Sequence, residues 1–516
     1  MRLPTALLAF LAASPCLLMA EPPPAWVATG GLDPDAFPPS RFLTGYGLSS
    51  PGGTEVEQRL QAQSMAREAL AATFRTHITS EFTSRTTQKD QQLSRFAQNL
   101  VSTRAEVELQ GLDTVLTWTD PQHKATHALA VLDKPRTLRL VAETLDREAT
   151  ACTQTYTRAK AAGDTAGLLE ARHLREHMEE GLLVRTVLGG GGAEPACPAQ
   201  AEIDGELRRL LAVRGDLGGP VALAALDLGA RLPRGVRVLM DNITYADTPF
   251  CGSLSAWLEQ ALAAELVAYG QVKVVDKTAG REAIRTGGMD ANLADALRSQ
   301  AVVRGTCFEL GEEVQLSLRI TSATGEELSA ATLKVPAALI RKAGLKLVPD
   351  NYLEARKALE ILDARVQDST LKVKVALDRG EGGIYREGEK LHLFLKANLD
   401  CYVKVLYHQV DGTNVLVFPN KYHPDGRIDK GVLYQIPPDD NSFVLQVEPP
   451  FGVEMVKVMA STQPLAVEGK DPDANGLAVV KEDLAKLLGR TRGIALKKAE
   501  AQYAEATAVV NTMAGK

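Results

Sequence analysis

Two stretches of the sequence have the residue types and the spacing of metal-binding sites. The first matches the calcium-loop pattern D-x-D/N-x-D/N-G-x5-E. In such a loop, side-chain oxygens, one backbone carbonyl and a bidentate glutamate surround the ion. The ligands here would be Asp471, Asp473, Asn475, the carbonyl of Leu477 and Glu482. A proline inside the loop is unusual, and the same residue types are also ordinary turn chemistry. A calcium site and a plain turn therefore both stay open.

The second stretch spells H-x-x-E-H, with His173, Glu176 and His177 at the defined positions. Two histidines one helical turn apart can bind zinc while the glutamate between them acts as a base. The charged residues around this motif favour a solvent-facing helix surface. A third zinc ligand would have to come from a carboxylate in another domain, such as Glu259. A zinc-dependent hydrolase is therefore an alternative hypothesis.

No further catalytic motif is found in the sequence. It contains no G-x-S-x-G elbow, no Walker loop and no G-x-G-x-x-G fingerprint after a strand. We therefore expect that the protein is not an enzyme. We also expect no cofactor other than calcium in the loop that begins at Asp471.

The composition excludes two classes of protein. The 516 residues include 58 Lys and Arg against 64 Asp and Glu, which gives a formal net charge of −6. Binding to nucleic acid is not expected, because phosphates need an excess of positive charge on the protein. Hydrophobic residues make up 45% of the chain, which excludes a disordered acidic protein. The length allows about three or four folded domains.

The first twenty residues have the layout of a secretory signal peptide. Arg2 precedes an apolar run, residues 6–18, that is too short to span a bilayer. Cleavage after Ala20 would release the chain into the periplasm, free or associated with the outer membrane. Cys16 leaves an alternative open, in which the chain is cut before this cysteine and lipidated. Only in that case would we expect contact with a membrane.

Export allows disulfide bonds to form. The cysteines after the signal peptide are Cys152, Cys197, Cys251, Cys307 and Cys401. None of them has the C-x-x-C spacing of a zinc ribbon or a redox pair. Cys251 follows the first strand of an expected parallel sheet and Cys307 ends the third, so both would lie at the carboxyl edge of that sheet. We therefore predict a disulfide between them.

Hydrophobic periodicity predicts a multidomain α+β protein. A strand, a long helix and a hairpin indicate an α+β domain over residues 41–135, which is followed by a helical hairpin over 136–215. The order strand, helix, strand, helix, strand over 236–343 indicates an α/β domain with parallel strands, completed by an antiparallel hairpin. Short alternating strands over 369–465 indicate a β-sandwich. The other predicted segments are a signal peptide (1–20), an extended leader (21–40), a linker (216–235), a helical linker (344–368), and a calcium-loop-like turn with a helical tail (466–516).

Three of these domains resemble parts of bacterial envelope proteins. Residues 42–47, together with the Ala-rich helix at 66–70, are similar to the small exported domain of LPP-type lipoproteins. The α/β domain resembles the amino-terminal domain of the Tol-Pal translocation protein TolB and the middle domain of the flagellar-ring protein FlgT. The sandwich resembles a bacterial domain of unknown function. The residues that carry the last two resemblances are 305–306 and 324–326 for the α/β domain, and 400–403, 418–420, 436–437 and 450–454 for the sandwich.

These resemblances imply a protein that works by contact with other components of the bacterial envelope, and they supply no catalytic residues. The sequence therefore predicts a non-catalytic accessory factor of the periplasm or the outer membrane. Its partners would be envelope proteins. The alternatives are the zinc-dependent hydrolase and a lipid-anchored surface protein.

Overall fold

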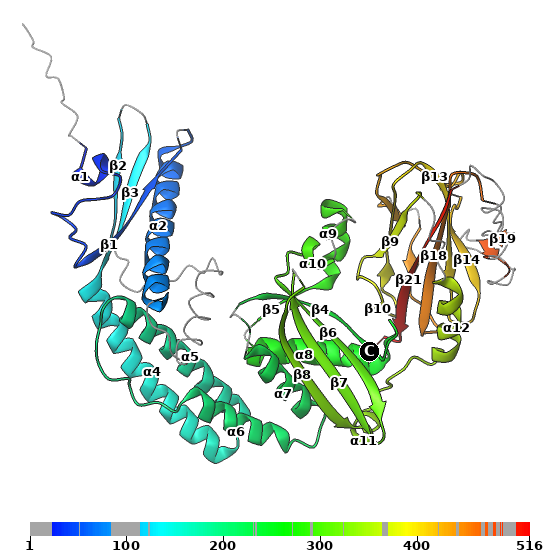
Figure 1. Ribbon diagram of the computed structural model, residues 1–516, viewed down its shortest axis with the longest axis horizontal. Helices are drawn as coiled ribbons and strands as arrows, with labels where there is room; N and C mark the ends of the chain where they lie inside the picture. Colours follow the sequence, from blue (N-terminus) through cyan, green and yellow to red (C-terminus); the bar gives the residue numbers. More distant parts are fainter. Residues whose placement is uncertain are drawn as a thin grey trace, which may run out of the picture. The chain divides into compact units, whose positions relative to one another are not determined.

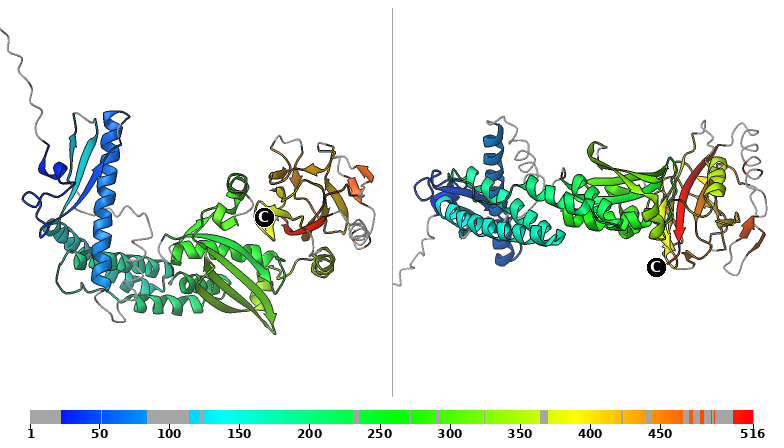
Figure 2. Two further views of the ribbon diagram at one scale, coloured as in Figure 1. Left: turned by 45° about the horizontal axis from the view of Figure 1, so that its top comes forward. Right: turned by 90° about the horizontal axis from the view of Figure 1, so that it is seen from below.

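The computed structural model forms two compact units, residues 1–203 and residues 204–516, and each is described by itself (Figures 1 and 2). Within the described part of the chain, no helix has the length and the hydropathy that a bilayer crossing needs. The structure describes residues 23–515 apart from residues 51, 84–113, 122–123, 231, 233–234, 271, 289–292, 324, 364–369, 422, 440–442, 466–469, 473–477, 481–485, 487 and 489–501.

A three-stranded antiparallel sheet with strand order β1-β3-β2 opens the first unit (Figure 1). Its strands are β1 (Phe42–Leu48), β2 (Thr114–Thr119) and β3 (Thr126–Asp133). Helix α2 (Glu55–Thr83) covers one face of the sheet. The strand, the helix and the hairpin predicted for this region are therefore present. The helix residues that form the apolar contact are Ala62, Ala66, Leu70 and Phe74.

Two glycines of β1 set how closely α2 approaches the sheet. A Cβ atom on Gly45 would overlap the backbone of Ala66 and Leu70, and a Cβ atom on Gly47 would overlap the backbone of Ala62. Any larger residue at these positions would push the helix away from the strand. The F-L-T-G-Y-G segment at residues 42–47 therefore has a packing role, because only glycine leaves room for a helix backbone directly on the strand.

The predicted extended leader is instead folded against the sheet. Its described residues, 23–40, contain a short helix, α1 (Ala25–Ala28), and Trp26 is only 5% exposed. Trp26 packs with Leu129 and Val131 on the sheet face opposite α2. The many prolines and glycines prevent long regular elements here, but the aromatic and aliphatic side chains between them cover an apolar face that would otherwise meet water.

We expect Gly45→Ala to destabilise α2, because the added methyl group has no space between strand and helix. Overpacking of this kind costs about 1–3 kcal/mol. The free energy of opening of α2, measured by hydrogen exchange with mass spectrometry, should fall by that amount. Gly191→Ala is the matched control, since a Cβ at Gly191 meets no atom within 4 Å. Equal protection of α2 in the two variants would contradict the close approach.

A helical hairpin follows the sheet, as the sequence predicts. It consists of α4 (Lys134–Ala162) and α5 (Thr165–Val187). The side chain of Asp133 accepts a hydrogen bond from the backbone N–H of Arg136 and so caps α4, and Gly163 ends this helix with a φ of 64°. A disulfide between Cys152 and Cys197 ties the segment after α5 back to α4. Helix α6 (Gln200–Ala212) contains the boundary between the two units.

An α/β domain opens the second unit. Its sheet has the order β5-β4-β6-β7-β8, in which β4 is parallel to β5 and β6, while β6, β7 and β8 are antiparallel. Helices α7 and α8 lie on one face of the sheet, and α9 and α10 lie on the other (Figure 1). The bounds are α7 (Gly218–Gly229), β4 (Arg237–Tyr245), α8 (Ser253–Gly270), β5 (Lys273–Val275), η1 (Lys277–Ala279), α9 (Gly280–Gly287), α10 (Leu293–Ala296), β6 (Ala301–Leu310), β7 (Glu313–Ser322), β8 (Glu327–Pro336) and α11 (Ala337–Lys342).

Helix α7 replaces most of the linker predicted over residues 216–235. The Gly218-Gly219-Pro220 sequence has the residues of a turn, but proline is tolerated in the first turn of a helix, where its missing N–H has no partner in any case. The run from Val221 to Leu228 is apolar on nearly every side, and most of it is buried. Burial of this helix against α8 and β8 outweighs the turn signal.

The C-terminal domain is a β-sandwich, with helix α12 (Tyr352–Leu362) before it. A large sheet with the order β10-β21-β18-β13-β14-β20-β19 shares an apolar core with a smaller sheet, β16-β12-β9. The other face of the large sheet packs on α12. The strands are β9 (Val373–Leu377), β10 (Gly383–Arg386), β11 (Lys390–Leu391), β12 (Leu393–Ala397), β13 (Cys401–His408), β14 (Asn414–Phe418), β15 (Arg427–Ile428), β16 (Tyr434–Ile436), β17 (Leu445–Gln446), β18 (Val453–Ser461), β19 (Lys470–Pro472), β20 (Ala478–Val480) and β21 (Tyr503–Met513).

The predicted helical tail is wrong for residues 503–513, which form β21. This strand lies inside the large sheet, antiparallel to β18 over nine residue pairs and parallel to β10. The Ala-rich and Glu-rich composition favoured a helix. The segment is buried over most of its length, however, and tertiary pairing overrides such a weak local preference. The sandwich therefore includes a strand from beyond its predicted end at residue 465.

Candidate functional site

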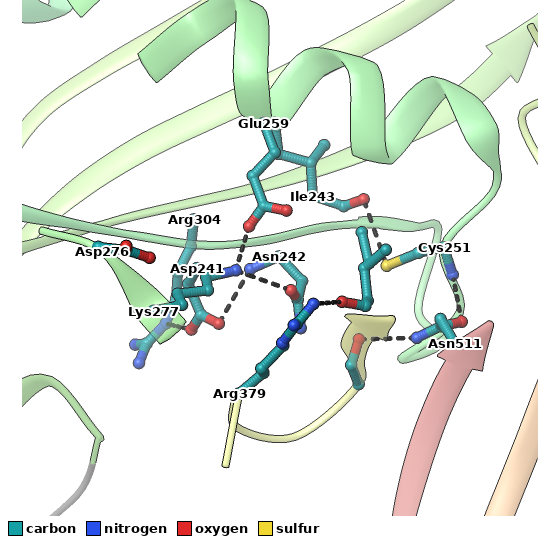
Figure 3. Close-up of polar contacts among 12 residues, drawn as sticks. Asp241, Asn242, Ile243, Cys251, Glu259, Asp276, Lys277, Arg304, Arg379 and Asn511 are labelled. Atoms are coloured by element: carbon teal, nitrogen blue, oxygen red, sulfur yellow. Dashed lines mark hydrogen bonds and ion pairs between the residues drawn. The ribbon is translucent and has the colours of Figure 1, made fainter. Parts of the chain in front are cut away.

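The α/β domain and the sandwich meet at a polar junction inside the second unit (Figure 3). We define this junction by Asn242, Cys251, Glu259, Lys277 and Asn511. They come from five places: β4, the loop after it, α8, the start of η1 and β21. The junction brings polar groups from distant parts of the sequence into one buried region.

A buried ion pair is the centre of this junction. Glu259 and Lys277 each have side chains that are only 16% exposed, and the Lys277 ammonium donates to a Glu259 carboxylate oxygen. The same ammonium donates to Oδ1 of Asn242 at 3.0 Å. Burial raises the pKa of the Glu259 carboxyl, while the charge of Lys277 acts against this shift. Charges that are this poorly hydrated are tolerated only when they are paired and hydrogen-bonded.

Two asparagines carry the junction across to the sandwich. Nδ2 of Asn242 donates to the carbonyl of Glu381 at 2.7 Å. Oδ1 of Asn511 accepts from the backbone N–H of Cys251 at 2.8 Å, and its Nδ2 donates to the carbonyl of Gly382 at 2.7 Å. Residues 381–382 belong to the turn before β10, so both asparagines hold the same turn. They satisfy backbone groups that would otherwise be buried without partners.

Aromatic packing reinforces the junction next to these hydrogen bonds. Phe250 is fully buried and belongs to the apolar cluster on the outer face of the large sheet, with Met455 and Val509. Its ring lies edge-on to Tyr352 of α12, with the ring centroids 6.0 Å apart. Tyr245 contacts the same ring of Tyr352 at 5.6 Å. The β4–α8 loop therefore joins the two domains through apolar as well as polar contacts.

This arrangement of groups is suited to holding domains together. The carboxylate of Glu259 and the ammonium of Lys277 neutralise each other, and the amides of Asn242 and Asn511 bind backbone. Burial raises the pKa of the Cys251 thiol far above its ordinary value, so it stays protonated and weakly nucleophilic. Among the described residues, no group of three or more His, Cys, Asp or Glu side chains could hold a metal ion.

Removing one partner of the ion pair should destabilise the second unit. We expect Lys277→Met to lower the free energy of opening of α8 by about 3–5 kcal/mol, because it leaves the Glu259 carboxyl buried without its counter-charge. Hydrogen exchange of α8 measures this quantity. The double variant Lys277→Met/Glu259→Leu should recover most of the loss. Lys346→Met, in a pair with Asp350 that is 62% and 72% exposed, should change little. A small effect of Lys277→Met would contradict the role of the pair.

The sandwich contains two further pairs of ionisable groups. Lys457 of β18 and Glu505 of β21 are diagonal neighbours on adjacent strands, with side chains 1% and 0% exposed and a distance of 2.5 Å between Nζ and Oε2. The Lys457 ammonium also donates to the carbonyl of Leu362, at the end of α12.

Tyr407 donates to Oε2 of Glu454 at 2.8 Å. Burial raises the pKa of Glu454 to about 7, although the hydrogen bond from Tyr407 acts in the opposite direction.

The raised pKa of Glu454 predicts a pH-dependent stability. The folded protein holds this proton more tightly than the unfolded chain, so the contribution is complete below the ordinary value of 4.5 and is lost as the pH rises through about 7. We expect the wild type to lose up to about 3 kcal/mol relative to Glu454→Gln across this window. Hydrogen exchange of β18 at a series of pH values measures the difference. Glu448→Gln, at an exposed position, is the control. A difference that does not change with pH would contradict the prediction.

The residues predicted to bind calcium lie mostly outside the described residues. Asp471 is in β19, whereas Asp473, Asn475, Leu477 and Glu482 are not described. The calcium loop therefore stays a prediction. Cys16 and the rest of the predicted signal peptide also lie outside the described residues.

The H-x-x-E-H motif lies on α5, and its side chains have other partners. Glu176 forms an ion pair with Arg172 at 2.9 Å and accepts from Gln200 at 3.3 Å. His177 is 67% exposed, and its Nδ1 is 3.8 Å from a carboxylate oxygen of Glu148. Glu259, which was considered as the third ligand, is bound by Lys277 in the other unit. The glutamate that would act as the base is thus held by an arginine, and the zinc hypothesis gains no support from this geometry.

The predicted Cys251–Cys307 disulfide is not present. Both cysteines are free thiols, and the disulfide of the described structure is Cys152–Cys197. The thiol of Cys251 is directed toward the carbonyl of Ile243, with Sγ and O 3.8 Å apart. A shared sheet edge brings two cysteines into one region, but a disulfide also requires their side chains to point at each other. Cys401 is buried in the sandwich core, as predicted.

The comparison with protein families finds one match in the sandwich. The family model described as "Domain of unknown function (DUF4384)" matches residues 384–464. These residues lie within the segment that resembles a domain of unknown function in the sequence. The match covers a small part of the chain, so the resemblances of the other domains to envelope proteins stay predictions. No curated protein matches the chain.

Several solved structures have a similar arrangement over part of the chain. The LpoB C-terminal domain from Salmonella enterica is 14% identical and covers 22% of this chain and 98% of its own, with a TM-score of 0.20. The secreted protein HP1454 from Helicobacter pylori is 7% identical, and the match covers 56% of this chain and 85% of HP1454, with a TM-score of 0.23. TolB from Acinetobacter baumannii is 11% identical, and the match covers 48% of this chain and 71% of TolB, with a TM-score of 0.15. At these scores the likenesses carry no argument about function.

Sequence reasoning missed the junction because its parts have no fixed spacing. Two local signals could have pointed to it. Glu259 lies in a helix that is mainly apolar, and Lys277 comes two residues after the end of β5. A charged side chain at either position needs an oppositely charged partner. Glu259 and Lys277 are each other's partner.

Proposed function

We propose that the protein is an exported, non-catalytic factor of the bacterial envelope that acts by binding other envelope proteins. The observation that carries this proposal is the structural use of the buried ionisable groups. Glu259 is bound by Lys277, Glu505 by Lys457 and Glu176 by Arg172. Pairing of this kind stabilises a fixed surface and gives each of these carboxylates a structural use.

Two further observations support export and binding. The first twenty residues have the layout of a signal peptide, and the Cys152–Cys197 disulfide suits an oxidising compartment. Exposed apolar side chains are present in both units, including Leu60 on α2 at 60% and Val267 on α8 at 53% exposure. On α2 the exposed Val56 lies one helical turn before Leu60, so these two apolar side chains share one face of the helix.

In-cell photo-cross-linking tests the proposal. A photoreactive benzoyl-phenylalanine at Leu60 or Val267 of the full chain should give adducts with exported proteins, because both side chains are exposed. The control is the same variant without residues 1–20, which should give none of these adducts, since it would stay in the cytoplasm. Adducts with cytoplasmic proteins only, or none from the exported variants, would contradict the proposal.

A further inference from the structure

A cleft of about 580 Å³ lies in the second unit, next to the polar junction. It is bordered by α8, by the end of β10 and by residues 513–515, which follow one another at the C-terminal end of β21. Figure 1 shows this end of the chain beside α8. The volume is within the range of about 300–1,000 Å³ that is usual for small-ligand pockets.

The walls of the cleft are mainly apolar. Trp257, Ala256 and Ala261 of α8 form one side, and Leu345 and Met513 contribute to the rest. Trp257 is half-buried, so part of its ring faces the cleft. An indole ring and a thioether are both adaptable apolar surfaces, suited to a large apolar side chain of a ligand.

Two hydrogen-bond donors at the cleft have no partner within the part of the chain that the structure describes. The guanidinium of Arg386 is half-buried and makes neither a hydrogen bond nor a close ion pair there, although its charge helps to lower the pKa of the neighbouring Glu389 carboxyl. The indole N–H of Trp257 donates to no group in that part of the chain. Glu389, the carboxylate of the same turn, is already bound by Arg379 at 2.6 Å. Since arginine is the preferred partner of carboxylates, the cleft is complementary to a ligand with a negative charge.

The edge of the sheet at this place does not offer backbone groups for strand addition. β10 is the last strand in the sheet order, but the carbonyl of Ile384 accepts from Nη1 of Arg379 at 2.9 Å. The backbone N–H of Arg386 donates to Glu389 at 2.6 Å. Side chains thus occupy the positions that an added strand would need. A ligand at the cleft must be held by side chains.

We propose that this cleft binds a peptide segment of a partner protein that carries a large apolar side chain next to a carboxylate. The carboxylate lies against Arg386, and the apolar side chain lies against Trp257 and Met513. Charge complementarity to the unpaired guanidinium and the apolar walls together select this chemistry. The inference rests on the proposed function and specifies the kind of partner that the protein recognises.

Small probes with the two chemical features test the site in the full chain. N-acetyl-phenylalanine and N-acetyl-leucine should bind at millimolar concentrations in ligand-observed NMR, and each should bind about tenfold more tightly than its amide. Arg386→Gln should abolish this preference for the acid. Trp257→Phe should retain binding and Trp257→Ala should lose it. Arg356→Gln, on the exposed side of α12, is the matched control. Circular dichroism melting of each variant checks its folding.

The same experiment shows whether the carboxylate of the ligand is a chain end or a side chain. It also has outcomes that would overturn the inference. N-acetyl-aspartyl-phenylalanine amide tests a side-chain carboxylate, and binding of either this probe or N-acetyl-phenylalanine supports the inference. Equal affinity for acid and amide, no binding of any peptide probe, or tighter binding of decanoate would overturn it. Envelope cross-links from Val267 that persist when the probes fail to bind would leave the proposed function standing. Probe binding without envelope cross-links would support the inference about the cleft and would contradict the proposed function.

Discussion

The cost of removing Glu259 and Lys277 from water is the constraint on which the second unit depends. Neither side chain can stay at its position without the other, because an unpaired buried charge costs several kcal/mol. Their pairing fixes α8 against η1, and Asn242 extends the contact to the turn before β10. Trp257 lies on α8 two residues before Glu259, on a different side of the helix. The ion pair therefore also determines where the indole ring stands relative to Arg386, and with it the shape of the cleft.

The sandwich uses the same principle at a second place. Lys457 is paired with Glu505 across two neighbouring strands, and its ammonium also donates to Oγ1 of Thr507 and to the carbonyl of Leu362 at the end of α12. A positive charge at a helix C-terminus is favourable, because the unpaired carbonyls there carry partial negative charge. This contact specifies one orientation of α12 on the sheet, which apolar packing alone would leave less defined. The first unit reaches a defined packing by another route, through the absence of side chains at Gly45 and Gly47.

Elements with a strong hydrophobic period could be predicted from the sequence, whereas elements decided by tertiary context could not. The period-3.6 pattern of α4 and the alternation of β13 are each visible within a single segment. Helix α7 and strand β21 are different. The first begins with residues typical of a turn, and the second has a composition typical of a helix. In both cases the deciding term is burial against partners that are remote in sequence.

The junction shows most clearly why the candidate site could not be predicted. Asn511 binds the backbone of Cys251, 260 residues earlier in the chain, and no spacing rule connects the two. The H-x-x-E-H motif, in contrast, has a defined spacing, but its Glu176 is held by Arg172, one turn away on the same helix. Local spacing is informative only where one element supplies all the groups that react. In this protein the polar contacts with the strongest structural consequences join different elements, so burial and pairing identify them and motif spacing does not.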